Sequence, residues 1–174
     1  MGFGSIIAAM VSVSAILLAS YVCSGGGFYM ADVLSDSFSE MQENKNEMLK
    51  TEIEITGATT DGVDILLSVN NTGAVKIGDF EYMDVIVLYS NSSNTTKTVW
   101  IPYQEENTTL AGNHWKVYSI SPDLINPGIF DAGEMMKMQI RLSASDPITN
   151  HSENWVQVTT PNGAGDSIYF KKVK

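Results

Sequence analysis

The sequence is poor in cysteine and in basic residues, and each shortage excludes a class of protein. Cys23 is the only cysteine among 174 residues, so no intrachain disulfide can form and a globular part must be held by its apolar core. Ten Lys and Arg oppose twenty Asp and Glu, which gives a formal net charge of -10. The basic tail of Lys171, Lys172 and Lys174 is too short to neutralise a phosphate backbone. These features argue against a nucleic-acid-binding protein.

Motifs for catalysis are also missing. The chain has no nucleophile elbow, phosphate loop, cysteine pair or dinucleotide fingerprint, and His114 and His151 stand alone in polar turns. We therefore predict that the chain is not an enzyme and holds no cofactor. Asp123, Asp131 and Glu134 could gather near one loop and bind calcium, but they lack the ordered spacing of a calcium loop. We expect these carboxylates to be solvated or to cap turns.

Charge is absent before Asp32, and this absence defines the first structural element. Phe3 to Cys23 is a continuous uncharged run that would form a helix about 31 Å long, enough to cross a hydrocarbon core. A cleaved secretory signal is the alternative. The run is longer than the usual apolar region of such a signal, and no Lys or Arg precedes it, so we favour a retained membrane helix.

Small residues are interleaved along this run and would allow other helices to approach closely. An ordinary single anchor is an equally good explanation of the same composition. The small residues are Gly4, Ser5, Ala8, Ala9, Ser12, Ser14, Ala15, Ala19 and Ser20.

Three consecutive glycines follow the apolar run. Gly25, Gly26 and Gly27 each cost about 1 kcal/mol relative to alanine inside a helix, so they predict a kink or hinge. Beyond them the pattern is helical again and amphipathic. One apolar seam is expected, with the acidic residues mostly off it, and such a seam is more often core than a partner surface. The seam consists of Met30, Leu34, Phe38, Met41 and Met48.

After residue 50 the apolar period changes from helical to two. Val63, Ile65, Leu67 and Val69 alternate with polar residues, and so do the residues from Met136 to Leu142. Turn residues separate the strands, and no space is left for long crossovers, so we predict an antiparallel immunoglobulin-like β-sandwich over residues 51–174. With the helix over residues 1–50, the fold class is α+β. The other expected strands are 52–56, 84–89, 98–103, 115–120, 155–159 and 166–171.

Glycosylation is the strongest local signal. Five asparagines open an Asn-X-Ser/Thr sequon without proline, more than the roughly two expected from this Ser and Thr content. The signal favours acceptors on an exported surface, although a loop composition rich in Ser and Thr would produce sequons without glycans. The five are Asn70, Asn91, Asn94, Asn107 and Asn150.

A chain that begins MGFGSIIAAMVSVSAILLASYV, passes through glycines into an amphipathic helix and ends in a sandwich resembles the archaellins. This family of archaeal flagellins is similar at its N-terminus to type IV pilins. The phrases FEYMDVIVLY, WKVYSISPDLINPGIFDAGE and NWVQVTTPNG are also similar to archaellins and to accessory proteins of the archaellum. The resemblance covers nearly the whole chain, although no phrase is a strict diagnostic motif.

The resemblance implies a homo-oligomeric helical filament for swimming motility. The N-terminal helices would form its core, and the sandwiches would lie outside the cell after a membrane-anchored stage. It implies that helix packing is carried by Ile6, Ile7, Met10, Val11, Val13, Ile16, Leu17 and Leu18.

One feature departs from the archaellins, which are made with a short basic leader. Nothing basic precedes Gly2, which fits either a mature form or a protein without a leader. The second possibility fits stator-like accessory proteins, which stay in the membrane and contact the surface layer. We favour the filament subunit because of the sequons and the small-residue helix. An adhesive pilus subunit is a third interpretation that sequence cannot separate.

Overall fold

The computed structural model describes residues 2–91, 93, 95–105, 109–149 and 153–172. It divides into two compact units, Met1–Lys45 and Asn46–Lys174. The first unit is helical and the second contains all eight strands. The sequence-predicted boundary after residue 50 coincides with the last residue of the helix, whereas the units divide after Lys45. The last turn of the helix therefore belongs structurally to the second unit.

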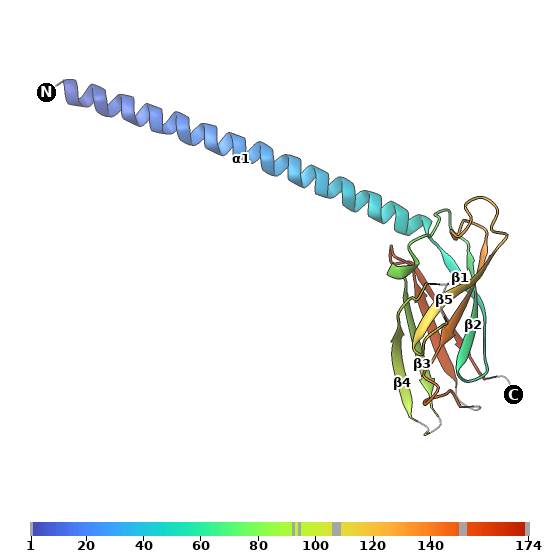
Figure 1. Cartoon of the computed structure of the whole chain (residues 1–174). Helices are drawn as coiled ribbons and strands as arrows, with labels where there is room; N and C mark the ends of the chain where they lie inside the picture. The colour runs from blue at the N-terminus through green and yellow to red at the C-terminus, as the bar shows by residue number, and fades with distance from the viewer. Residues whose placement is uncertain (1, 92, 94, 106–108, 150–152, 173–174) are drawn as a thin grey trace. The chain divides into compact units, whose positions relative to one another are not determined.

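Helix α1 runs from Phe3 to Lys50 without interruption. Figure 1 shows it as one unbroken coil. Gly25, Gly26 and Gly27 lie within its bounds. The interruption expected at these glycines is thus not a break in the helix. Their helical cost of about 1 kcal/mol each is tolerated because long stretches of helix-forming residues on both sides continue the hydrogen-bond ladder. Bending of α1 at the glycines stays a prediction.

The second unit is a sandwich of two four-stranded antiparallel sheets, which confirms the predicted α+β fold. One sheet has the order β1-β2-β6-β5, and the other has the order β4-β3-β7-β8 (Figure 1). All eight strands expected from the sequence are present. They are β1 (Ile53–Thr60), β2 (Asp64–Asn71), β3 (Asp84–Ser90), β4 (Thr96–Ile101), β5 (His114–Ser121), β6 (Met135–Arg141), β7 (Asn154–Thr159) and β8 (Gly165–Phe170).

The core lies between the two sheets and follows from the alternation of each strand. Along β2 and β6 the buried residues are every second one, as a half-buried strand requires. Trp115 and Phe130 are two of the large aromatic members of this core, and both are fully buried. Tyr103 packs against the Trp115 ring at a centroid distance of 4.9 Å. A core of this kind stabilises the unit without a disulfide.

The outer edges of the two sheets meet on both sides of the sandwich. On one side the chain leaving β4 pairs with β5, where the backbone N–H of Trp115 donates to the Pro102 carbonyl at 3.0 Å. On the other side the Ile55 N–H donates to the Asp166 carboxylate at 2.7 Å and joins β1 to β8. These contacts lie beyond the end of β4 and at one residue of β1, and they tie the two sheets to each other.

Candidate interaction surfaces

The first half of α1 offers an apolar surface on every side. The eight residues that the archaellin resemblance assigns to helix packing have exposed fractions between 49% and 67%. Successive helical residues are about 100° apart, so pairs such as Ile6 and Ile7 or Leu17 and Leu18 face different directions. A helix that is apolar all round is found in a membrane or inside an assembly. By length and composition, α1 can cross a membrane.

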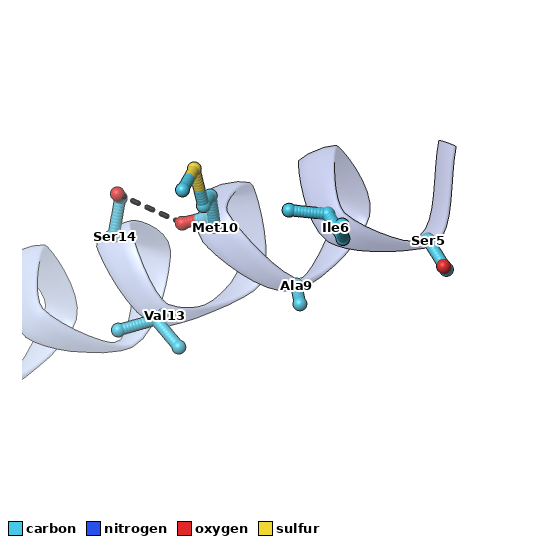
Figure 2. A pocket seen from close by; sticks show the side chains of 6 residues that line it. All are labelled: Ser5, Ile6, Ala9, Met10, Val13 and Ser14. Atoms are coloured by element: carbon cyan, nitrogen blue, oxygen red, sulfur yellow. Dashed lines mark hydrogen bonds between the residues drawn. The ribbon is translucent and has the colours of Figure 1, made fainter. Parts of the chain in front are cut away.

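Two serines of this segment bond their hydroxyls to the helix backbone. The Ser14 hydroxyl donates to the Met10 carbonyl at 2.9 Å, as Figure 2 shows, and the Ser12 hydroxyl donates to the Ala8 carbonyl at 2.8 Å. These bonds satisfy the hydroxyl protons within the helix, which lowers the cost of removing them from water. The surface therefore suits lipid as well as another helix.

A shallow hollow on this half of the helix shows where another apolar segment would fit. It is lined by Ser5, Ile6, Ala9, Met10, Val13 and Ser14 (Figure 2). The small side chain of Ala9 lies between larger neighbours, which is the arrangement that permits close helix packing. Ser5, Ala9 and Ser14, three of the small residues in the apolar run, line this hollow.

The second half of α1 differs from the first in charge. Between Ser24 and Lys50 the sequence carries five acidic residues and two lysines, against none in Phe3 to Cys23. The predicted apolar seam is present on this half, but none of its members is buried, with exposed fractions from 48% for Met48 to 75% for Met30. Acidic side chains are well solvated here, and the seam is an apolar strip between them. The five acidic residues are Asp32, Asp36, Glu40, Glu43 and Glu47.

The C-terminal end of α1 is held against the sandwich by hydrogen bonds from the loop after β2. The Ala74 N–H donates to the Lys50 carbonyl at 2.7 Å, and the Gly73 N–H donates to the Glu52 carbonyl at 2.9 Å. A Cβ on Gly73 would lie 2.4 Å from the Glu52 nitrogen, so only glycine allows this approach. On the other side the Thr51 hydroxyl donates to the Glu47 carbonyl and accepts from the Asn162 amide. The last turn of α1 is therefore a fixed part of the sandwich.

The candidate calcium ligands are occupied by local donors. Both carboxylate oxygens of Asp131 accept from the Asn126 amide, and the Asp123 carboxylate accepts from the Gly128 N–H. Glu134 accepts from the Asp131 N–H at 2.9 Å. Within the described ranges no three acidic, histidine or cysteine side chains are grouped to hold a metal. The arrangement is that of turn-capping carboxylates, and we do not propose a calcium site.

Two of the five sequon asparagines are described residues, and neither is freely exposed in a loop. Asn70 is half-buried in the β1-β2-β6 ladder. Asn91 is only 6% exposed, and its side-chain oxygen accepts from the Ser93 and Thr95 N–H groups. A glycan on Asn91 would have to be attached before the chain folds. Asn94, Asn107 and Asn150 fall outside the described residues, and glycosylation at all five stays a prediction.

A surface that the sequence reasoning missed lies on the outer side of the β4-β3-β7-β8 sheet. Trp100 and Tyr169 are 58% and 68% exposed there, and Trp155 lies directly opposite Tyr169 across the β7-β8 ladder. The alternation within TVW, NWV and IYF was the available signal. The sequence pattern predicts strands at these residues, but it does not by itself place the three aromatic side chains on one outer face.

A sequence relative and two solved structures resemble this chain. An uncharacterised protein of Archaeoglobus fulgidus is 28% identical over 172 residues, covering 98% of this chain and 96% of that protein. The archaellum periplasmic stator protein FlaG of Sulfolobus acidocaldarius has 21% identity and a TM-score of 0.51, over 69% of this chain and 99% of FlaG. The archaeal flagellum of Methanospirillum hungatei has 14% identity and a TM-score of 0.53, over 99% of this chain and 93% of its subunit.

At these identities the two solved structures share the fold and establish nothing finer. The family assignment comes from the sequence, because the archaeal-type flagellin family matches residues 2–170. That family comprises structural components of the archaellum and is not an enzyme family. With its unbroken apolar-to-acidic helix and its two-sheet sandwich, the chain belongs to the archaeal-type flagellin family.

Proposed function

We propose that the chain is a membrane-anchored component of the archaellum. Phe3 to Cys23 spans the bilayer, and the acidic remainder of α1 leads through water to a sandwich outside the cell. The observation that carries this proposal is the step in charge along one continuous helix, from no charged residue before Cys23 to five acidic residues before Lys50. The first segment requires an apolar surrounding, and the second requires a hydrated one.

The acidic half argues against deep burial among like copies. In a bundle of such helices the five acidic residues would be removed from water, and only Lys45 and Lys50 on this half could supply positive charge to pair with them. Burying unpaired carboxylates costs several kcal/mol each. A hydrated helix avoids that cost, and at 1.5 Å per residue the segment from Ser24 to Lys50 is about 40 Å long.

A filament subunit is the second candidate, and one observation favours it. The hollow around Ala9 and the internally bonded serines would let helices of many copies pack closely. The sequence alone led us to favour this candidate partly because of the sequons. That support is weaker now, because Asn91 is buried and Asn70 lies within a sheet.

Fractionation of cells that produce the native protein separates the two candidates. Filaments are sheared from the surface and purified, and the remaining membranes are collected. We expect the chain in the membrane fraction, at a small fraction of the abundance of the major filament protein. Recovery of the chain as a stoichiometric filament component would overturn the anchor and establish the filament subunit.

A membrane-anchored component also needs a partner outside the membrane. From the archaellin resemblance we propose the surface layer, which the sandwich would contact. Full-length protein in detergent is incubated with isolated surface-layer sheets at physiological salt, and the pelleted fraction is measured. Retention well above that of a protein of similar negative charge supports the contact, and equal retention counts against it.

A further inference from the structure

The outer faces of the two sheets differ in chemistry. The outward positions of β1, β2, β6 and β5 carry five charged residues, namely Glu54, Asp64, Lys116, Lys137 and Arg141. Those of β4, β3, β7 and β8 carry one, Asp84, and its carboxylate accepts from the Trp100 indole N–H at 3.0 Å. One face of the sandwich is thus nearly free of charge in a chain with a net charge of -10.

Apolar side chains gather on this uncharged face. The strand register places Ile86 opposite Trp100, and it places Leu88, Trp155 and Tyr169 in the adjacent row across β3, β7 and β8. We call these five residues the aromatic face. Tryptophan and tyrosine are the residues that dominate binding at protein interfaces. Trp100 and Tyr169 lie on the two edge strands of this sheet. The other sheet also exposes Tyr118 and Leu66, so it is the scarcity of charge around the aromatic residues that indicates a contact surface here.

We propose that the aromatic face binds the same face of a second copy of this chain. Two copies of an acidic protein repel each other wherever charged surfaces approach, so an uncharged patch is where they meet at least cost. Face-to-face pairing about a two-fold axis needs no second complementary surface.

The size of the aromatic face fits copies that are already held together. Strand spacing and rise give a four-stranded sheet of about five residues a footprint of roughly 300 to 400 Å². A stable interface between free proteins buries about 800 Å² on each partner. The pairing therefore depends on the anchored helices of the proposed function, which concentrate the sandwiches at one membrane surface.

Matched cysteines on the two outer faces test the pairing. Gln157 of β7 and Gln139 of β6 are half-buried glutamines at outward positions of central strands, one on each face. Gln157→Cys and Gln139→Cys are each made with Cys23→Ser in the full-length protein, which is reconstituted in vesicles and treated with a short thiol cross-linker. We expect covalent dimers from Gln157→Cys and at most a trace from Gln139→Cys. Equal yields from the two variants, or none from either, would reject the pairing.

Aromatic substitutions establish which side chains carry the contact. Tyr169→Ser, on the aromatic face, is compared with Tyr118→Ser, which removes a tyrosine of similar exposure, 63% against 68%, from the other sheet. The double variant that carries both Tyr169→Ser and Trp100→Ser should weaken self-association by about thirtyfold or more, as loss of interface aromatics does. Thermal unfolding verifies that both variants fold. Unchanged cross-linking in the folded Trp100→Ser and Tyr169→Ser variant would overturn the proposal.

Cross-linking in whole cells separates this proposal from the proposed function. Gln157→Cys dimers of the chain support the pairing, whether the protein is recovered with membranes or with filaments. A cross-link from Gln157→Cys to a different protein, with no dimer, would assign the aromatic face to that partner and reject self-association. Fractionation alone decides the anchor, so either proposal can fail while the other holds.

Discussion

The helix and the sandwich bury their apolar residues in opposite ways. No residue of α1 is buried within the chain, whereas the sandwich encloses a continuous core in which residues such as Trp115 and Val85 are fully buried. A unit with its own core folds by itself, and an apolar helix without one depends on its surroundings. The difference teaches that one part of this protein is specified by its own chain and the other by a membrane or by further copies.

Core substitution should produce the largest effect, and only in the sandwich. Trp115→Ala removes a fully buried indole and should lower the free energy of unfolding of the sandwich by about 3 to 5 kcal/mol. Near-ultraviolet circular dichroism of full-length protein in detergent follows the sandwich, and the far-ultraviolet helix signal follows α1. Simultaneous loss of both signals would show that the two units are not independent.

Trp115→Phe is the matched control for this loss. The indole nitrogen of Trp115 is buried and finds no hydrogen-bond acceptor among the described residues. Phenylalanine keeps most of the ring volume and removes this unpaired donor, so it should cost clearly less than alanine. A cost equal to that of alanine would mean that the indole nitrogen has a partner after all.

A charge in the apolar half of α1 should affect membrane retention and leave the sandwich unchanged. Val13→Arg places a cation near the centre of the spanning segment, at a cost of about 3 kcal/mol, or roughly a hundredfold in partitioning. The measurement is the membrane-bound fraction after an alkaline wash. Ser39→Arg, in the acidic half, is the control and should be retained like the native protein. Equal retention of Val13→Arg would place the membrane contact elsewhere.

The close contact between Gly73 and the C-terminal end of α1 should not tolerate an added methyl group. Gly73→Ala places a Cβ against the backbone of Lys50 and Glu52, at 2.6 and 2.4 Å, and neither atom belongs to a flexible side chain. We expect a loss of about 2 kcal/mol in the stability of the sandwich. Gly57→Ala is the control, because its Cβ would meet nothing within 4 Å. Comparable melting temperatures for the two variants would contradict this close contact.

The smallest expected effect concerns alkaline stability. Burial, together with the nearby negative charge of Asp146, to which the tyrosine hydroxyl donates, raises the pKa of Tyr89 from 10.0 to about 12. Because the folded pKa is the higher one, this contribution to stability is complete below pH 10 and is lost as the pH rises toward 12. The sandwich should therefore destabilise between these values.

Tyr89→Phe removes this titration and should flatten the alkaline decline measured by denaturant unfolding. At neutral pH the variant should lose only about 1 kcal/mol, because the ring remains buried and one hydrogen bond is lost. The helix signal serves as an internal reference in the same experiment. An unchanged alkaline slope in Tyr89→Phe would assign the decline to other groups.

Much of the fold followed from local pattern. The period of two located all eight strands, because a sheet with one buried face alternates whatever its neighbours are. Turn residues were equally informative: Gly62, Gly128, Gly133 and Gly163 lie at positive φ, where glycine is favoured. The apolar run from Phe3 to Cys23 required only a count of charges.

Other features depended on contacts between segments far apart in the chain. The glycine triplet predicted a kink or hinge; α1 remains helical through it, because helix propensity is a weak preference beside a long hydrogen-bond ladder, and the bend itself stays a prediction. The Asn91 sequon looked like an exposed loop, but its side chain is buried within the turn that it organises.

By itself the sequence determined a helix that must leave water, an acidic continuation of that helix and a sandwich with a disulfide-free core, because each depends on composition or on neighbours along the chain. Only the tertiary structure decided that Gly73 must be glycine and that Trp100, Trp155 and Tyr169 share one uncharged face. Those facts arise from strand order and register, which join residues that no local period connects.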